Sequence, residues 1–171
     1  ILKALDLKKN FPPYVKLHLE IIAGLNNKRN LKKLIKKYWS LNPSSLLRSI
    51  IIKILNDNDL TEIKFINEII NNNASEEESK KLLIYFAIKN LKWDIARENV
   101  IGMIGSNPSK DICYFMSDIE LGENNDKQKS DAWIMRAENA KLENCWTCRI
   151  TNQSQEEWSS LSNSGNYNSL V

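Results

Sequence analysis

The chain contains two copies of one pattern, an amphipathic helix closed by a proline, and this repetition constrains the fold more than any other feature. In each copy three residues recur on one helical face: Leu31, Ile35 and Tyr38 in the first, and Ala96, Val100 and Met103 in the second. Pro43 and Pro108 follow these faces and are expected to stop the two helices. The arrangement matches the second half of the tetratricopeptide pattern, in which a proline follows a small or apolar position by about 12 residues. The sequence therefore predicts repeated helical hairpins.

Helical periodicity extends this prediction over most of the chain. Residues 1–9 read as the end of a helix, and hairpins are expected over residues 11–39, 44–70, 75–104 and 112–140. The third is expected to open with a capping box at Ser75, and the last to pack through Ala132, Trp133 and Ala137. With only 5 Gly and 4 Pro, the chain suits helices better than short strands. The predicted fold is all-α, a tetratricopeptide-like solenoid of about four helical hairpins over residues 1–142. Trp39, Trp93 and Trp133 are predicted to be packing residues.

The C-terminal segment, residues 143–171, differs in composition from the rest. It is rich in Ser, Asn and Gln, and it also carries the apolar residues Trp146, Trp158, Tyr167 and Leu170. A simple disordered tail would hold fewer apolar residues. We therefore expect an irregular, aromatic-containing cap that lies against the last hairpin, because the terminal repeats of a stacked array need a cover.

Apolar runs and the first residues of the chain bear on its location in the cell. No apolar run approaches the roughly 18 to 20 residues that a membrane helix requires. The chain begins with Ile-Leu-Lys-Ala-Leu, without an initiator Met. We expect it to be a soluble fragment whose N-terminal part is missing.

Charge is distributed unevenly along the chain. Residues 1–53 hold 12 Lys and Arg against 2 Asp and Glu, whereas the remainder holds 12 against 19. The densest part is a basic patch made of Lys28, Arg29, Lys32, Lys33, Lys36 and Lys37. A solvated helix face is the favoured interpretation, because Leu31, Ile35 and Tyr38 supply a buried stripe on the same helix. Binding of RNA or of an anionic membrane through residues 28–37 is the alternative.

The residues capable of chemistry form no recognisable catalytic group. Cys145 and Cys148 have metal-ligand spacing, but a structural zinc site needs about four ligands and no second pair follows. Incidental thiols or a local disulfide are the favoured interpretations. His18 has no nucleophile paired with it by any motif, and the acidic run at Glu76 fits a helix start. The sequence predicts no catalytic residue, no metal and no cofactor.

Several segments resemble the C-terminal repeat region of the HemY family, tetratricopeptide proteins associated with haem biosynthesis in proteobacteria. The segments are Tyr38-Trp39, residues 41–47, Ala87-x5-Trp93-x2-Ala96, residues 115–120, Asn125-Asp126, Ala132-Trp133, and the tail segments 145–158 and 166–170. The resemblance implies a domain held at the bacterial inner membrane by an N-terminal transmembrane region and facing the periplasm. It also implies a non-enzymatic scaffold whose protein partners are enzymes of tetrapyrrole metabolism.

The HemY resemblance implies a partner-binding groove along the first helix of each hairpin. The groove residues it implies are Lys16, Glu20, Lys81, Tyr85 and Lys89. Leu19 and Ile84 stand where the repeat pattern prefers a small residue, so the register of these helices is left open.

Three other functions remain open beside the scaffold. One is direct porphyrin binding, for which His18, Met103, Cys113 and Met116 are the available axial ligands. Another is the basic surface already described. The last is an adaptor of an unrelated pathway.

Overall fold

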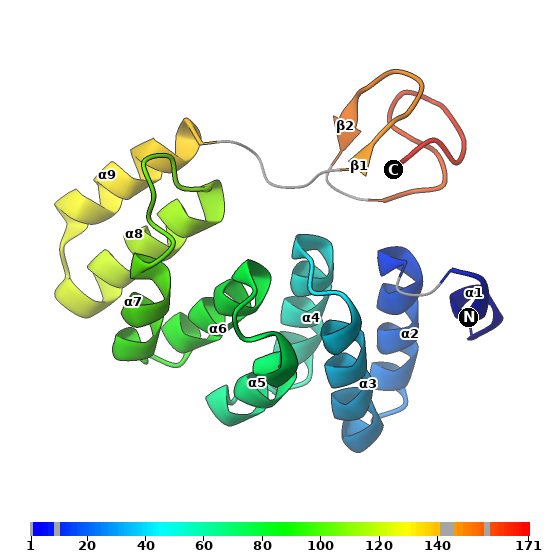
Figure 1. The fold of residues 1–171 in the computed structure, drawn as a ribbon, viewed down its shortest axis with the longest axis horizontal. Helices are drawn as coiled ribbons and strands as arrows, with labels where there is room; N and C mark the ends of the chain where they lie inside the picture. The colour runs from blue at the N-terminus through cyan, green and yellow to red at the C-terminus, as the bar shows by residue number, and fades with distance from the viewer. Residues whose placement is uncertain (1, 9–10, 141–145, 156–157) are drawn as a thin grey trace. The chain divides into compact units, whose positions relative to one another are not determined.

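A computed structural model describes residues 2–8, 11–140, 146–155 and 158–171. The chain divides into two compact units, Ile1–Lys141 and Leu142–Val171, one residue from the boundary predicted between repeat domain and cap. Helices dominate the first unit, and the strands described are two short ones in the second (Figure 1). The all-α fold class predicted from the sequence is confirmed.

The first unit consists of consecutive helix–turn–helix pairs after a short helix α1 (Leu2–Leu7). The pairs are α2 (Pro12–Gly24) with α3 (Lys28–Leu41), α4 (Ser45–Asp57) with α5 (Ile63–Ile70), α6 (Glu77–Lys89) with α7 (Trp93–Ile101), and α8 (Lys110–Asn124) with α9 (Lys127–Glu138). A 3-10 turn, η1 (Asn71–Asn73), extends α5. These four pairs are the hairpins that the periodicity predicts.

The turn inside each hairpin repeats the same backbone conformation. Asn26, Asp59, Leu91 and Asn125 all have a positive φ, between 51° and 56°. They follow one another at intervals of 33, 32 and 34 residues, close to the 34-residue tetratricopeptide period. Asn and Asp tolerate this left-handed conformation better than other non-glycine residues, whereas Leu91 adopts it at a steric cost. The turn residue thus sets a common register for the first helices. The second helices begin two residues after it, except α5, which begins four residues after Asp59.

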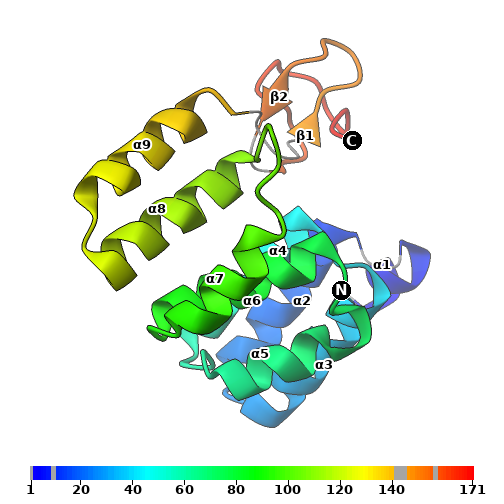
Figure 2. The same cartoon turned by 60° about the vertical axis from the view of Figure 1, so that its left-hand side comes forward.

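The first helices of successive hairpins pack on one another. Helix α2 contacts α4, α4 contacts α6, and α6 contacts α8. We call α2, α4, α6 and α8 the first-helix row. Figures 1 and 2 also show α8 and α9 running side by side, as their contacts require.

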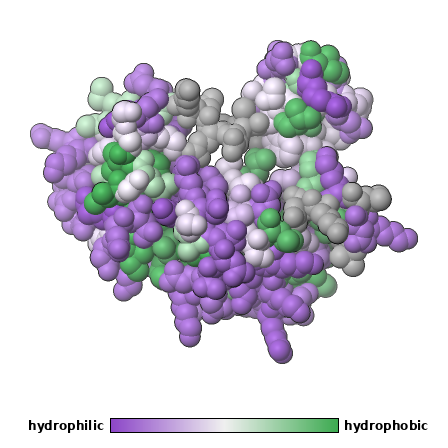
Figure 3. Space-filling view, in the orientation of Figure 1, coloured by the Kyte–Doolittle hydropathy of each residue, from purple (hydrophilic) through white to green (hydrophobic). Residues whose placement is uncertain are grey.

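Two apolar clusters hold the hairpins together. The first extends from α1 to α6 and includes Trp39, which is fully buried. The second joins α6, α7 and α8, and Trp93 and Trp133 pack against it while partly buried. The predicted packing role of these three tryptophans is confirmed. The face seen in Figure 3 is mainly hydrophilic and is interrupted by separate hydrophobic patches.

The structure departs from the predicted helix bounds in the third hairpin. Helix α7 ends at Ile101, earlier than the predicted end near Ile104, and Pro108 lies beyond a connecting loop. The chain between Gly102 and Gly105 forms tight turns, which two helix-weakening glycines favour. Helix α6 begins at Glu77 after the N-cap Glu76, so the predicted capping box at Ser75 is wrong.

The packed face of the last hairpin is also different from the prediction. Ala137 is buried as expected, but Ala132 is exposed. Ser130 takes a buried place instead, with its Oγ 2.8 Å from Ser117 Oγ on α8. Two buried hydroxyls that hydrogen-bond to each other can take the place of two apolar side chains in a packed face. The hydropathy pattern of the sequence does not reveal such a pair.

The second unit is small and contains more regular structure than predicted. Strands β1 (Trp146–Thr147) and β2 (Ser154–Gln155) pair antiparallel, with Trp146 opposite Gln155. Bridges also join Cys148 to Leu170 and Leu161 to Tyr167. Trp146 and Leu170 are buried, whereas Tyr167 is exposed. The placement of this unit against the last hairpin stays a prediction.

Candidate functional site on the first-helix row

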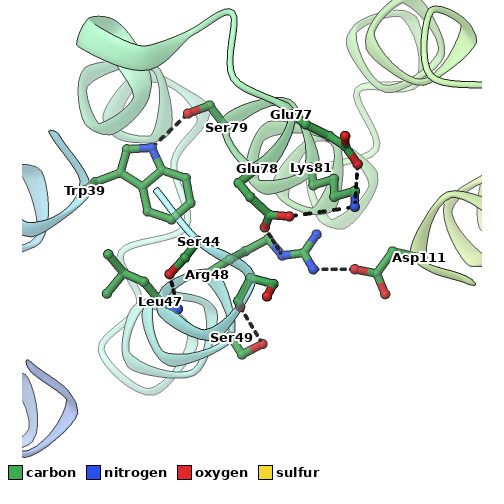
Figure 4. A network of polar contacts seen from close by, with 11 residues as sticks. Trp39, Ser44, Leu47, Arg48, Ser49, Glu77, Glu78, Ser79, Lys81 and Asp111 are labelled. Carbon is green, nitrogen blue, oxygen red and sulfur yellow. Dashed lines mark hydrogen bonds and ion pairs between the residues drawn. The ribbon is translucent and has the colours of Figure 1, made fainter. Parts of the chain in front are cut away.

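A network of charged side chains links three successive members of the first-helix row. Arg48 comes from α4, Glu77, Glu78 and Lys81 from α6, and Asp111 from the first turn of α8 (Figure 4). Ser44 caps α4 by accepting a hydrogen bond from the Leu47 backbone N–H, which orients the turn that carries Arg48. The carboxylates in the first turns of α6 and α8 also complement the positive ends of those helices.

The geometry makes Glu78 the centre of this charge network. Its Oε2 lies 3.3 Å from Arg48 Nε, and its Oε1 lies 3.7 Å from Lys81 Nζ. Arg48 Nη2 also donates to Asp111 Oδ2, and Lys81 Nζ lies 2.8 Å from Glu77 Oε1. The side chains of Arg48 and Lys81 are only 8% and 2% exposed. Charged groups that are shielded from water in this way need oppositely charged partners. Because the partners come from different helices, the network fixes the spacing of α4, α6 and α8.

A second polar cluster lies farther along α4 and α6. Asn56 Nδ2 donates to Tyr85 Oη at 3.0 Å, and Lys89 Nζ donates to Asn56 Oδ1 at 2.6 Å. Tyr85 is half-buried, whereas Lys89 is exposed. The structure therefore brings together two of the predicted groove residues and adds Asn56, which the sequence analysis missed.

The other predicted groove residues separate into two classes. Lys16 and Glu20 are exposed on α2. Lys81 differs from the expectation of a surface cation, because it is 1% exposed and paired with Glu77 and Glu78. The spacing of those carboxylates, three and four residues before Lys81, is the signal that could have revealed the pairing.

The sequence analysis also missed Arg48 and Asp111. Arg48 lies within the mainly apolar stretch of residues 46–52 of α4, and a cation in such a place signals a buried ion pair. Its partners come from other hairpins, at distances along the chain that local spacing cannot connect.

Leu19 and Ile84, whose register the repeat pattern left open, occupy equivalent places. Each lies seven residues before the left-handed turn residue of its hairpin, and each is fully buried. The helices therefore share a register in which this position holds a large apolar residue.

The basic patch lies on α3 and divides by environment. Lys28, Arg29, Lys33 and Lys37 are exposed. Lys32 lies over the Phe65 ring at 4.6 Å, and Lys36 Nζ lies 3.2 Å from Glu68 Oε2. Leu31, Ile35, Tyr38 and Trp39 bury the opposite side of the helix, as the favoured interpretation of a solvated face requires.

The residues considered for haem ligation belong to different parts of the core. His18 is 9% exposed and its Nδ1 lies 2.6 Å from Tyr38 Oη. Burial, and after it the positive charge of Lys37, lowers the pKa of His18. Met103 and Met116 pack in the second cluster, and Cys113 is a buried free thiol on α8.

In the second unit, Cys148 is a buried free thiol surrounded by polar groups. Its Sγ lies 3.2 Å from Ser169 Oγ, and Asn166 Nδ2 donates to it at 3.8 Å. Hydrogen bonds from Ser164, Ser169 and Thr151 lower the pKa of Cys148 to about 5. Cys145, the other cysteine of the predicted pair, lies outside the described residues.

Two features concern metals and membranes. In the described ranges, no three His, Cys, Asp or Glu residues gather in a way that could hold a metal ion. Of the helices described, none is long and apolar enough to cross a membrane.

Comparisons with known proteins add no assignment. Neither protein-family models, nor curated proteins, nor solved structures match this chain. The resemblance to the HemY family accordingly stays a prediction.

Proposed function

We propose that this protein is a non-enzymatic scaffold that binds a segment of a partner protein along the first-helix row. The observation that carries the proposal is the contact of first helices from successive hairpins, each closed by the same left-handed turn. Stacked helical hairpins of this kind form extended solenoid surfaces that bind other proteins.

The polar groups of the row suit binding of an extended, charged segment. The Arg48–Glu78–Lys81 network is shielded from solvent and holds α4 against α6. Exposed Lys16, Glu20 and Lys89 then offer charges of both signs on a surface whose spacing is fixed before binding. A rigid surface loses less conformational entropy when a partner docks, which favours affinity.

Charge reversal on the row tests the proposal directly. The chain would be used as bait against detergent-solubilised membranes, and retained proteins would be identified by mass spectrometry. The variant Lys16→Glu/Lys89→Glu is expected to lose at least tenfold of the retained partner while its melting temperature stays within a few degrees. Lys64→Glu changes a lysine that is also exposed but lies on the second helix α5, and this control variant is expected to retain the partner. Equal retention by both variants would remove the first-helix row as the binding surface.

The identity of the retained protein tests the narrower part of the proposal. We propose, from the HemY resemblance, that the partner is an enzyme of tetrapyrrole metabolism at the bacterial inner membrane. Retention of an unrelated complex that Lys16→Glu/Lys89→Glu still abolishes would support the row and reject the haem assignment.

The exposed cations of α3 support a second candidate, binding of RNA or anionic membrane. Lys28, Arg29, Lys33 and Lys37 are all exposed on one helix. Binding through them should weaken steeply as salt rises, because it releases condensed counterions. Binding that is insensitive to salt, or that survives Lys33→Glu/Lys37→Glu, would exclude this function.

A further inference from the structure

The cluster of Asn56, Tyr85 and Lys89 fixes the direction of its own hydrogen bonds. An ammonium group only donates hydrogen bonds, so the atom of the Asn56 amide that lies 2.6 Å from Lys89 Nζ is the oxygen. The amide nitrogen then faces Tyr85, and it donates to the phenolic oxygen at 3.0 Å. Tyr85 is therefore the acceptor in this contact. Its own hydroxyl hydrogen is used by neither of the other two residues.

The hydroxyl of Tyr85 is a donor held in place without an acceptor. Among the residues that the structure describes, none accepts a hydrogen bond from it. The ring packs against the first apolar cluster and stands edge-on to Phe86, with ring centroids 5.0 Å apart. Because the side chain is half-buried and its ring is packed, the hydroxyl offers its hydrogen from a fixed position to a group that arrives from outside.

The ammonium group of Lys89 keeps an uncompensated positive charge. Its hydrogen bond goes to the neutral amide of Asn56, and it forms no ion pair with any carboxylate in the described part of the chain. Lys81 on the same helix is the contrast, since it is buried and paired with Glu77 and Glu78. Lys81 thus serves the packing of the row, whereas exposed Lys89 has N–H donors left for a ligand.

The two donors lie together on one face of α6. Tyr85 precedes Lys89 by four residues, which places the side chains one helical turn apart. Asn56 of α4 bonds to both and so fixes them at the contact between two neighbouring first helices. A carboxylate has two acceptor oxygens, one for each donor. Its single negative charge also matches one lysine better than a phosphate group does, whose charge is about −2 at neutral pH.

We propose that Tyr85 and Lys89 form a carboxylate-binding site that takes an Asp or Glu side chain of the partner segment. Tyr85 Oη donates to one carboxylate oxygen and Lys89 Nζ to the other, while Asn56 holds both donors. Because the first-helix row continues on both sides of the site, a segment that lies along the row presents a side chain there and not its chain end. The inference rests on the proposed scaffold function and adds to it the chemistry of the partner.

A peptide array probed with the full chain tests this site. The probes are short immobilised peptides of varied sequence with blocked ends, each made once with Glu and once with Gln at one position. The wild-type protein is expected to bind Glu peptides about fivefold more tightly than their Gln counterparts, because a partly exposed charge pair contributes modestly. The Tyr85→Phe/Lys89→Gln variant should bind both forms alike. Lys64→Gln, which removes an exposed lysine from α5, is the control and should keep the preference.

The single variants separate binding from folding. Lys89→Gln changes an exposed side chain and should remove most of the preference for Glu at an unchanged melting temperature. Tyr85→Phe keeps the charge of Lys89 and removes only the hydroxyl, so it should lose part of the preference. A structural role of Tyr85 alone would lower the melting temperature and leave the ratio of Glu to Gln binding unchanged.

Three results would overturn the proposal. Peptide binding by the wild-type protein without a preference for Glu would reject the site and leave the first-helix row standing. A Glu preference that persists in folded Lys89→Gln would assign it to other cations of the chain and also reject the site. Absence of any bound peptide would reject the scaffold function and the site together.

Discussion

Gly122 offers the sharpest test of how the third and fourth hairpins pack. A Cβ added there would lie 2.3 Å from Trp93 Cη2 and 2.7 Å from its Cζ2. Carbon atoms in contact prefer about 3.5 to 4.0 Å, so the indole of α7 would have to move by more than about 1 Å. Trp93 packs against the second apolar cluster, which opposes that movement.

Two effects of Gly122→Ala oppose each other, and their magnitudes decide the result. Replacing a helical Gly by Ala ordinarily stabilises by about 1 kcal/mol. Overpacking costs about 1 to 3 kcal/mol. With a cost near the middle of that range, the variant is expected to lower the free energy of unfolding by about 1 kcal/mol.

A double-mutant cycle with Trp93→Leu separates these effects. Leu lacks the ring atoms that meet the added Cβ, so Gly122→Ala should stabilise the Trp93→Leu protein by up to about 1 kcal/mol. The expected coupling between the two positions is therefore about 2 kcal/mol. Urea unfolding followed by far-ultraviolet circular dichroism measures all four proteins. A Gly122→Ala protein that is more stable than the wild type, with no coupling to Trp93, would refute the packing argument.

The remaining predictions concern the buried polar groups. Arg48→Met leaves carboxylates without their cation and should cost about 3 kcal/mol in urea unfolding; a loss below about 1 kcal/mol would mean that water solvates the network. The pKa of His18 is lowered in the folded state, so the neutral ring contributes fully to stability above about pH 6.5, the ordinary pKa of histidine. This contribution is lost as the pH falls through the folded-state pKa of His18. His18→Gln should flatten that acid-side decline in melting temperature, and an unchanged pH profile would contradict the assignment. In a Cys113→Ala/Cys145→Ala protein, the ultraviolet absorbance of the Cys148 thiolate should titrate near pH 5. Titration near pH 9 would show that the surrounding hydroxyls do not stabilise the thiolate.

Helical periodicity in the sequence was enough to predict the four hairpins. Stripes such as Leu31, Ile35 and Tyr38 are local signals, because one helix face must be apolar wherever it packs. Helix ends were less predictable, since α7 stops at Ile101 and not near Ile104. Glycines weaken the end of that helix without marking one residue as its stop.

The candidate site depended on information that the sequence could not supply. Lys81 reads as a surface cation, yet the structure buries it beside Glu78. Arg48 and Asp111 are 63 residues apart, and only the stacking of α4, α6 and α8 brings them together. Composition and periodicity by themselves determined the all-α class, the hairpin order and the basic first half. Which charges are exposed and which are paired was decided by tertiary packing, because burial and Coulomb partners depend on neighbours in space.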